Sequence, residues 1–176
     1  MTEQPCPDRV RAYHEAGHAV LNLVFGYGLA YCSIEPSSDG IGGVSKRISE
    51  SVADGHYIRI LAAGEWAEYQ SGHNFESQPC DSGSWDDRLK MTPFLLPAAG
   101  YEVDAAFINN LPYGLTPEME EKLIRSMEWI MEAVTADFSE PSRMALLHEL
   151  AALLLEQGTL PPEVLDSLNE RYPMGT

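Results

Sequence analysis

The chain has 176 residues, a length that fits one domain, and its hydrophobic content of 44% is ordinary for a globular protein. Its 27 acidic residues outnumber its 11 basic residues and give a formal net charge of −16. Such a surface repels phosphate backbones and anionic lipids, so the composition argues against nucleic-acid binding and against binding to membrane surfaces.

The first predicted helix begins at Asp8, a residue type suited to the N-cap position. Apolar residues recur at helical spacing as far as Val24, and the glycines within 26–28 end the helix because glycine tolerates a left-handed backbone. Two strand patterns follow at 29–36 and 42–49, separated by the turn signal "SSDGIG". The sequence therefore predicts a β-hairpin directly after the first helix.

A second helical pattern covers residues 50–72, and the segment 71–84 reads as a loop rich in Ser, Gly and Pro. A short helix is expected to begin near Ser84. Pro93 and Pro97 should limit or kink it, because proline lacks the N–H that a helix interior needs.

The last third of the chain is strongly helical in pattern. Thr116 is a predicted N-cap, and Pro117 takes the first helical position, where the missing N–H costs nothing. Helices are then predicted through 120–138, 141–158 and 161–172. The predicted fold class is mainly α with a small β-hairpin or sheet.

The stretch "AYHEAGHAVL" on the first helix contains an HExxH motif. His14 and His18 are four residues apart, so both can direct ring nitrogens at one metal ion, while Glu15 lies about 100° round the helix axis. In zinc peptidases, two neutral histidines hold Zn²⁺ and the glutamate accepts a proton from water. The alternative is a helix whose histidines are ordinary buried residues. Gly17 leaves one edge of this helix bare, so another backbone can approach it.

A catalytic zinc site needs one more protein ligand and keeps a further position for water. The candidates outside the motif are His56, His73, Glu65, Glu68, Asp86 and Asp87. Each also has an ordinary interpretation, because lone histidines are usually exposed, glutamates line solvated helix faces, and acids at a helix N-terminus are stabilised by its dipole. The residue pattern alone does not choose among these six.

Several segments together resemble the peptidase domain of the FtsH-type, membrane-bound, ATP-dependent zinc proteases. "YHEAGHAVLNL" resembles the active-site helix of that family, and "CSIEPSSDGIGGVS" resembles its strand–turn–strand. "IRILAAGEWAEYQSG" is similar to its helix of small residues, "DSGSWDDRLKMT" to the segment with the third zinc ligand, and "LAALLLEQGTLPPEVL" to its C-terminal stretch. The matches keep the family's order over most of residues 10–165 and are weakest between about 93 and 115.

The resemblance implies a helical fold like that protease domain, with the HExxH motif on the first long helix. It implies one Zn²⁺ per chain held by His14, His18 and Asp87, with Glu15 as the general base. Glu68 matches a family glutamate near the site and is the reserve candidate.

The same resemblance implies one domain over residues 1–176. Its metal-site half would cover about 8–110 and its C-terminal helical half about 116–172. Asp86 falls on the asparagine that precedes the family's aspartate, and Glu65 and Tyr69 depart from the family pattern.

The expected function is zinc-dependent hydrolysis of peptide bonds in unfolded or short peptide substrates. The sequence has no G-x-x-x-x-G-K-[ST] phosphate loop, so we expect no ATPase activity of its own. A catalytically weak or inactive binding or adaptor domain is the alternative. The sequence does not decide whether the chain works with a separate ATPase or another protein partner, or whether it forms an oligomer.

The remaining features favour a cytoplasmic protein without membrane insertion. The three cysteines, Cys6, Cys32 and Cys80, are widely spaced, which argues against a disulfide framework and against a cysteine zinc cluster. The N-terminus has no apolar signal segment, and the longest apolar stretch, 19–34, is interrupted by polar and glycine residues and too short to span a bilayer.

Overall fold

The computed structural model describes residues 7–36, 42–47, 52–76, 83–111 and 113–172, which form helices and a small antiparallel sheet. The helices are α1 (Asp8–Val24), α2 (Asp54–Gln70), α3 (Ser84–Ala98), α4 (Ala105–Asn109), α5 (Pro117–Asp137), α6 (Pro141–Gln157) and α7 (Pro162–Arg171). The strands are β1 (Leu29–Pro36), β2 (Gly42–Arg47) and β3 (Thr159–Leu160). The prediction of a mainly α fold with a small sheet is confirmed.

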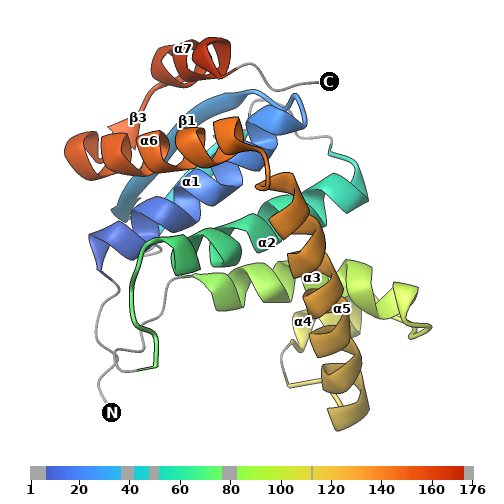
Figure 1. Cartoon of the computed structure of the whole chain (residues 1–176). Coiled ribbons are helices and arrows are strands. Elements are labelled where there is room, and N and C mark those ends of the chain that lie inside the picture. The colour runs from blue at the N-terminus through green and yellow to red at the C-terminus, as the bar shows by residue number, and fades with distance from the viewer. Residues whose placement is uncertain (1–6, 37–41, 48–51, 77–82, 112, 173–176) are drawn as a thin grey trace.

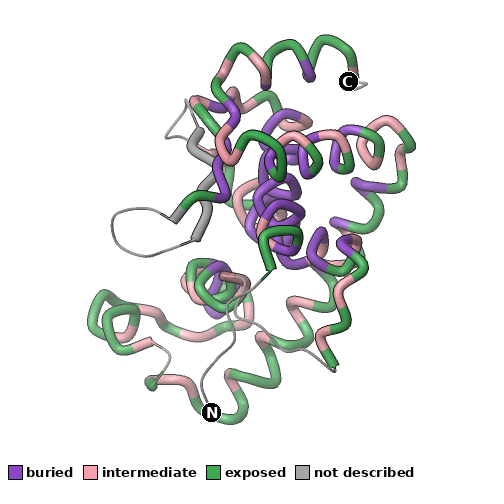
Figure 2. Tube along the Cα trace, turned by 90° about the vertical axis from the view of Figure 1, so that its left-hand side faces the viewer, coloured by how far each residue is buried: buried purple, intermediate pink, exposed green. Residues whose placement is uncertain are grey.

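Helix α1 is the central element, and 13 of its 17 residues are buried. It packs between α2 and α6 and also contacts β1 (Figure 1). Most of the buried positions gather at the centre of the molecule (Figure 2). The bare edge predicted at Gly17 is used by α2, because a Cβ on Gly17 would lie only 2.3 Å from the carbonyl oxygen of Ala63.

The sheet has the strand order β2–β1–β3. Strands β1 and β2 pair antiparallel, which confirms the predicted hairpin, although its turn signal at 37–41 lies outside the described residues. The short strand β3 pairs antiparallel with the other edge of β1, with Cys32 opposite Leu160. Because β3 directly follows α6, it anchors the end of that helix to the sheet.

Two expectations about the N-caps of helices can be compared with the structure. Asp8 is not the N-cap of α1, because Pro7 occupies that position and the Asp8 carboxylate instead pairs with Arg11 in the first turn. The predicted cap at Thr116 is confirmed, since its hydroxyl oxygen accepts a hydrogen bond from the Met119 N–H.

The two prolines do not end α3, which continues through both of them to Ala98. A proline inside a helix removes one backbone hydrogen bond. The burial of three apolar side chains of the same helix, Met91, Leu95 and Leu96, offsets the loss of these hydrogen bonds.

The helices of the C-terminal part join the same hydrophobic core as α1. Helix α5 packs against α2 and α3, and α6 packs against α1. Phe138 is 2% exposed, and its ring stacks on Trp66 of α2 with centroids 4.4 Å apart. Within the described parts of the chain, no helix combines the length and apolar character needed to cross a bilayer.

Candidate metal centre

Three of the predicted site residues meet in the interior. His14 and His18 extend from α1, and Asp87 extends from the first turn of α3. The two Nε2 atoms of the histidines are 2.9 Å apart, and Asp87 Oδ2 lies 3.1 Å from His14 Nε2 and 2.9 Å from His18 Nε2. All three residues are buried. The structure thus brings Asp87, which is far away in the sequence, to the two histidines of the motif.

The outer nitrogens of both imidazoles are already engaged. His18 Nδ1 lies 2.7 Å from the carbonyl oxygen of Ile60, and a carbonyl can only accept, so this nitrogen carries the hydrogen. His14 Nδ1 lies 2.6 Å from Glu68 Oε1, a carboxylate that likewise accepts. In the neutral rings, both Nε2 atoms therefore direct lone pairs at the same small volume.

The third atom at this point is also an acceptor. Among the described residues, no donor is aligned for a hydrogen bond with the buried Asp87 Oδ2, although two ring nitrogens are near it. Three converging acceptors repel one another unless a cation lies between them. Two imidazole nitrogens and one carboxylate oxygen are a donor set that suits Zn²⁺, and it leaves a coordination position open.

Further side chains hold this arrangement in place. Glu68 Oε1 also accepts a hydrogen bond of 2.6 Å from Ser84 Oγ, so it joins His14 on α1 to the start of α3. Asp87 Oδ1 accepts from Lys90 Nζ at 2.7 Å, and this contact leaves Oδ2 to face the histidines. Partners of this kind fix the rings and carboxylates that bind metals. Glu68 is therefore placed behind His14, and not among the converging atoms.

Glu15 follows His14 on α1 and is buried, with 4% of its surface exposed. It lies near enough to His14 for its negative charge to raise the pKa of that ring. A buried carboxylate beside the converging atoms can accept a proton from a water molecule held there.

The remaining predicted candidates lie elsewhere. His56 stacks on Phe25 with centroids 4.1 Å apart, and His73 contacts Phe75. Glu65 forms an ion pair with Arg88 on α3, and Asp86 is exposed. Of the six candidates for a third ligand, only Asp87 reaches the two histidines of the motif.

Gly64 on α2 was not predicted as a site residue, yet it makes the space for both imidazoles. A Cβ at this position would lie 2.5 Å from His18 Cε1 and 2.8 Å from His14 Cε1. Both distances are shorter than any stable contact, so a larger residue must displace the rings. The sequence gives one indication of this role: glycine destabilises the interior of a helix, so a glycine at such a position suggests that close packing requires it.

We expect Gly64→Ala to weaken zinc binding by roughly 10- to 100-fold, because shifting either ring breaks the convergence of the lone pairs. The measurement is competition with a chromophoric zinc chelator. Gly55→Ala is the matched control, since a Cβ on Gly55, in the first turn of the same helix, has open space around it. Equal zinc affinity of the two variants would contradict the role given to Gly64.

In the metal-free chain, a proton takes the place of the cation. Burial lowers the pKa of His14, but the nearby Asp87, Glu68 and Glu15 carboxylates outweigh that effect and raise it from 6.5 to about 10. Burial likewise opposes the charge of Asp87, but His18 and His14 keep the pKa of its carboxyl well below the usual range. His14 is therefore protonated at neutral pH when no metal is present.

This protonation predicts how pH affects the stabilisation by metal. The stability that protonated His14 contributes is fully present below about pH 6.5 and is lost as pH rises towards about 10. Zinc must displace this proton, so its affinity should rise by up to roughly tenfold per pH unit. We expect the difference in melting temperature between zinc-loaded and chelated protein to grow between about pH 6 and pH 8. A difference that shrinks or stays constant over this interval would contradict the prediction.

Two comparisons with known proteins give no information about this centre. A scan against models of protein families gives no match to the chain, and a search of curated proteins gives no match either.

Proposed function

We propose that the chain is a zinc-dependent metallopeptidase that hydrolyses peptide bonds in unfolded or short peptide segments. The observation that carries this proposal is the convergence of His14 Nε2, His18 Nε2 and Asp87 Oδ2 within about 3 Å of one another. The buried Glu15 of the same motif supports it, because it supplies a proton acceptor beside the metal-ligand set. The sequence resemblance to FtsH-type peptidase domains supports the choice of peptide bonds as the substrate.

Each side chain has a separate task in this proposal. Zn²⁺ bound by His14, His18 and Asp87 would supply Lewis acidity towards a water molecule and the scissile carbonyl. Glu15 accepts the proton of the attacking water and returns it to the leaving amine. Glu68 holds the ring of His14 in orientation through its hydrogen bond to Nδ1.

The test is hydrolysis of casein and of a peptide library by the purified chain, before and after treatment with a chelator. The proposal expects cleavage that is lost with the chelator and restored when zinc is added back. Cleavage that persists without metal would overturn it. A folded, zinc-loaded chain that cleaves none of these substrates would instead favour a binding or adaptor domain.

A further inference from the structure

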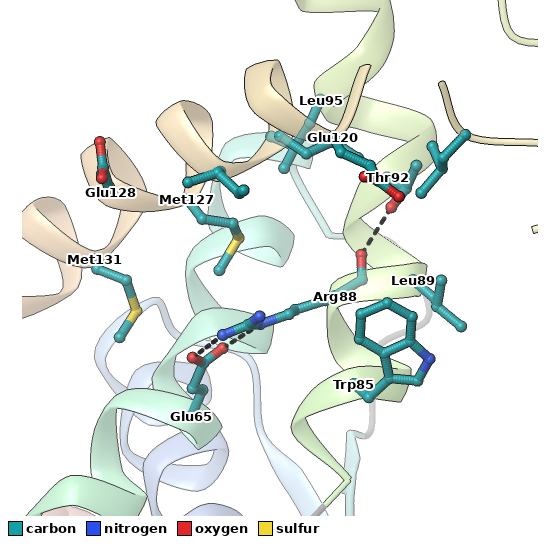
Figure 3. Close-up of a pocket in the computed structure, with 13 residues that line it drawn as sticks. Glu65, Trp85, Arg88, Leu89, Thr92, Leu95, Glu120, Met127, Glu128 and Met131 are labelled. Carbon is teal, nitrogen blue, oxygen red and sulfur yellow. Dashed lines mark hydrogen bonds and ion pairs between the residues drawn. The ribbon is translucent and has the colours of Figure 1, made fainter. Parts of the chain in front are cut away.

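A second feature lies between α3 and α5. Helices α3 and α5, with Glu65 of α2, enclose an open cavity of about 510 Å³, here called the α3–α5 groove (Figure 3). Its lining is mainly apolar and includes Trp85, Met127 and Met131. His14, His18 and Asp87 do not line it, so the groove is separate from the candidate metal centre.

The groove is elongated along α5. The residues that α5 contributes run from Glu120 to Met131 at spacings of three and four, which places them on one face of that helix. At about 1.5 Å per residue, this face is roughly 16 Å long, which corresponds to about three turns of a second helix. Ile124 and Trp85 are 61% and 53% exposed, so apolar surface is presented to solvent along this length. The flexible methionines allow the floor to adapt to different apolar side chains.

The charges around the groove are unbalanced. Glu120 and Glu128 of α5 are lining residues that are exposed. Arg88 also lines the groove, but its guanidinium is paired with both carboxylate oxygens of Glu65 (Figure 3). Two carboxylates thus flank an apolar floor on a chain with a net charge of −16.

We propose that the α3–α5 groove binds an amphipathic helix of a partner protein, with apolar residues on one face and Lys or Arg beside them. The length and apolar lining of the groove fit a helix-in-groove contact, and the carboxylates select a basic occupant. A second copy of this chain is a poorer occupant, because two chains with a charge of −16 repel each other. This binding is independent of the proposed peptidase activity.

The test measures binding of a fluorescent helical peptide of about 18 residues, built from Leu on one face and Lys on the other, by fluorescence anisotropy. A Leu/Glu peptide and a scrambled Leu/Lys peptide are the comparison probes. All measurements use the full chain carrying Glu15→Gln, so that the probe is not cleaved. Ile124→Gln and Trp85→Gln change the groove at exposed positions, and Leu155→Gln changes an exposed apolar residue on α6.

We expect each groove variant to weaken binding of the Leu/Lys helix by roughly tenfold, and Leu155→Gln to leave it unchanged. Combining Glu120→Gln with Glu128→Gln should weaken binding by roughly threefold. The same double change at Glu156 of α6 and Glu170 of α7, two exposed glutamates that do not line the groove, should not. The proposal is overturned if the basic, acidic and scrambled peptides bind alike, or if the groove variants bind like the controls. It is also overturned if the groove variants abolish self-association of the chain while no peptide binds.

Discussion

Replacing Glu15 with Gln is expected to reduce peptide hydrolysis by roughly 10²- to 10⁴-fold, because the amide cannot accept the proton of the attacking water. The substitution keeps the size of a side chain that is 4% exposed, so the packing of α1 should be preserved. Zinc content should also be preserved, since the converging atoms belong to His14, His18 and Asp87. The measurement is the cleavage rate at saturating peptide, with bound zinc determined on the same sample.

The matched control is Glu163→Gln, which makes the same chemical change at an exposed position in the first turn of α7. Its cleavage rate should equal that of the unmodified chain. If Glu15→Gln binds zinc and still cleaves at the original rate, Glu15 is not the general base.

Asp87→Ala is expected to lower zinc affinity by at least about 100-fold, because the proposed centre loses one of its three converging side chains. The unmodified chain should carry about one zinc ion, measured by mass spectrometry of metals after dialysis. The variant should lose the ion under the same conditions. It should also lose the pairing partner of Lys90, which then has freedom to turn towards solvent.

Asp86→Ala tests whether the effect is specific, because Asp86 is the exposed neighbour of Asp87 in the same helical turn. Both variants remove one acid from the N-terminal turn of α3, so both lose a similar interaction with the helix dipole. Zinc should be retained in Asp86→Ala and lost in Asp87→Ala. An unmodified chain that takes up no zinc when it is supplied would refute the proposed centre.

The local part of the site could be predicted from the sequence. His14 and His18 share one helix, and the spacing of four residues alone places them on one face. The hairpin was also predictable, because both strands and the turn signal are adjacent in the chain. The spacing of residues in the sequence could not identify Asp87 as part of the site, because its contact with α1 depends on how α3 packs. The resemblance to a known family selected it, and the structure brings it to the histidines.

Features that depend on tertiary packing were not predictable in this way. Strand β3 has only two residues, too few to show a period, and it is defined by its pairing with β1. The five-residue helix α4 is likewise too short to produce a helical pattern. The need for glycine at position 64 becomes visible only when two rings from another helix are placed against it.

The burial of α1 on every side has a consequence for how substitutions accumulate over evolution. Most residues from Val10 to Leu23 contact the core, so selection for folding alone should reject most substitutions across this stretch. Retention of its sequence in related chains would therefore reflect packing as much as catalysis. Glu15→Gln is the informative exception, because selection for folding should tolerate it and selection for hydrolysis should remove it. The ratio of Glu to Gln at this one position would separate lineages that kept catalysis from lineages that kept only the fold.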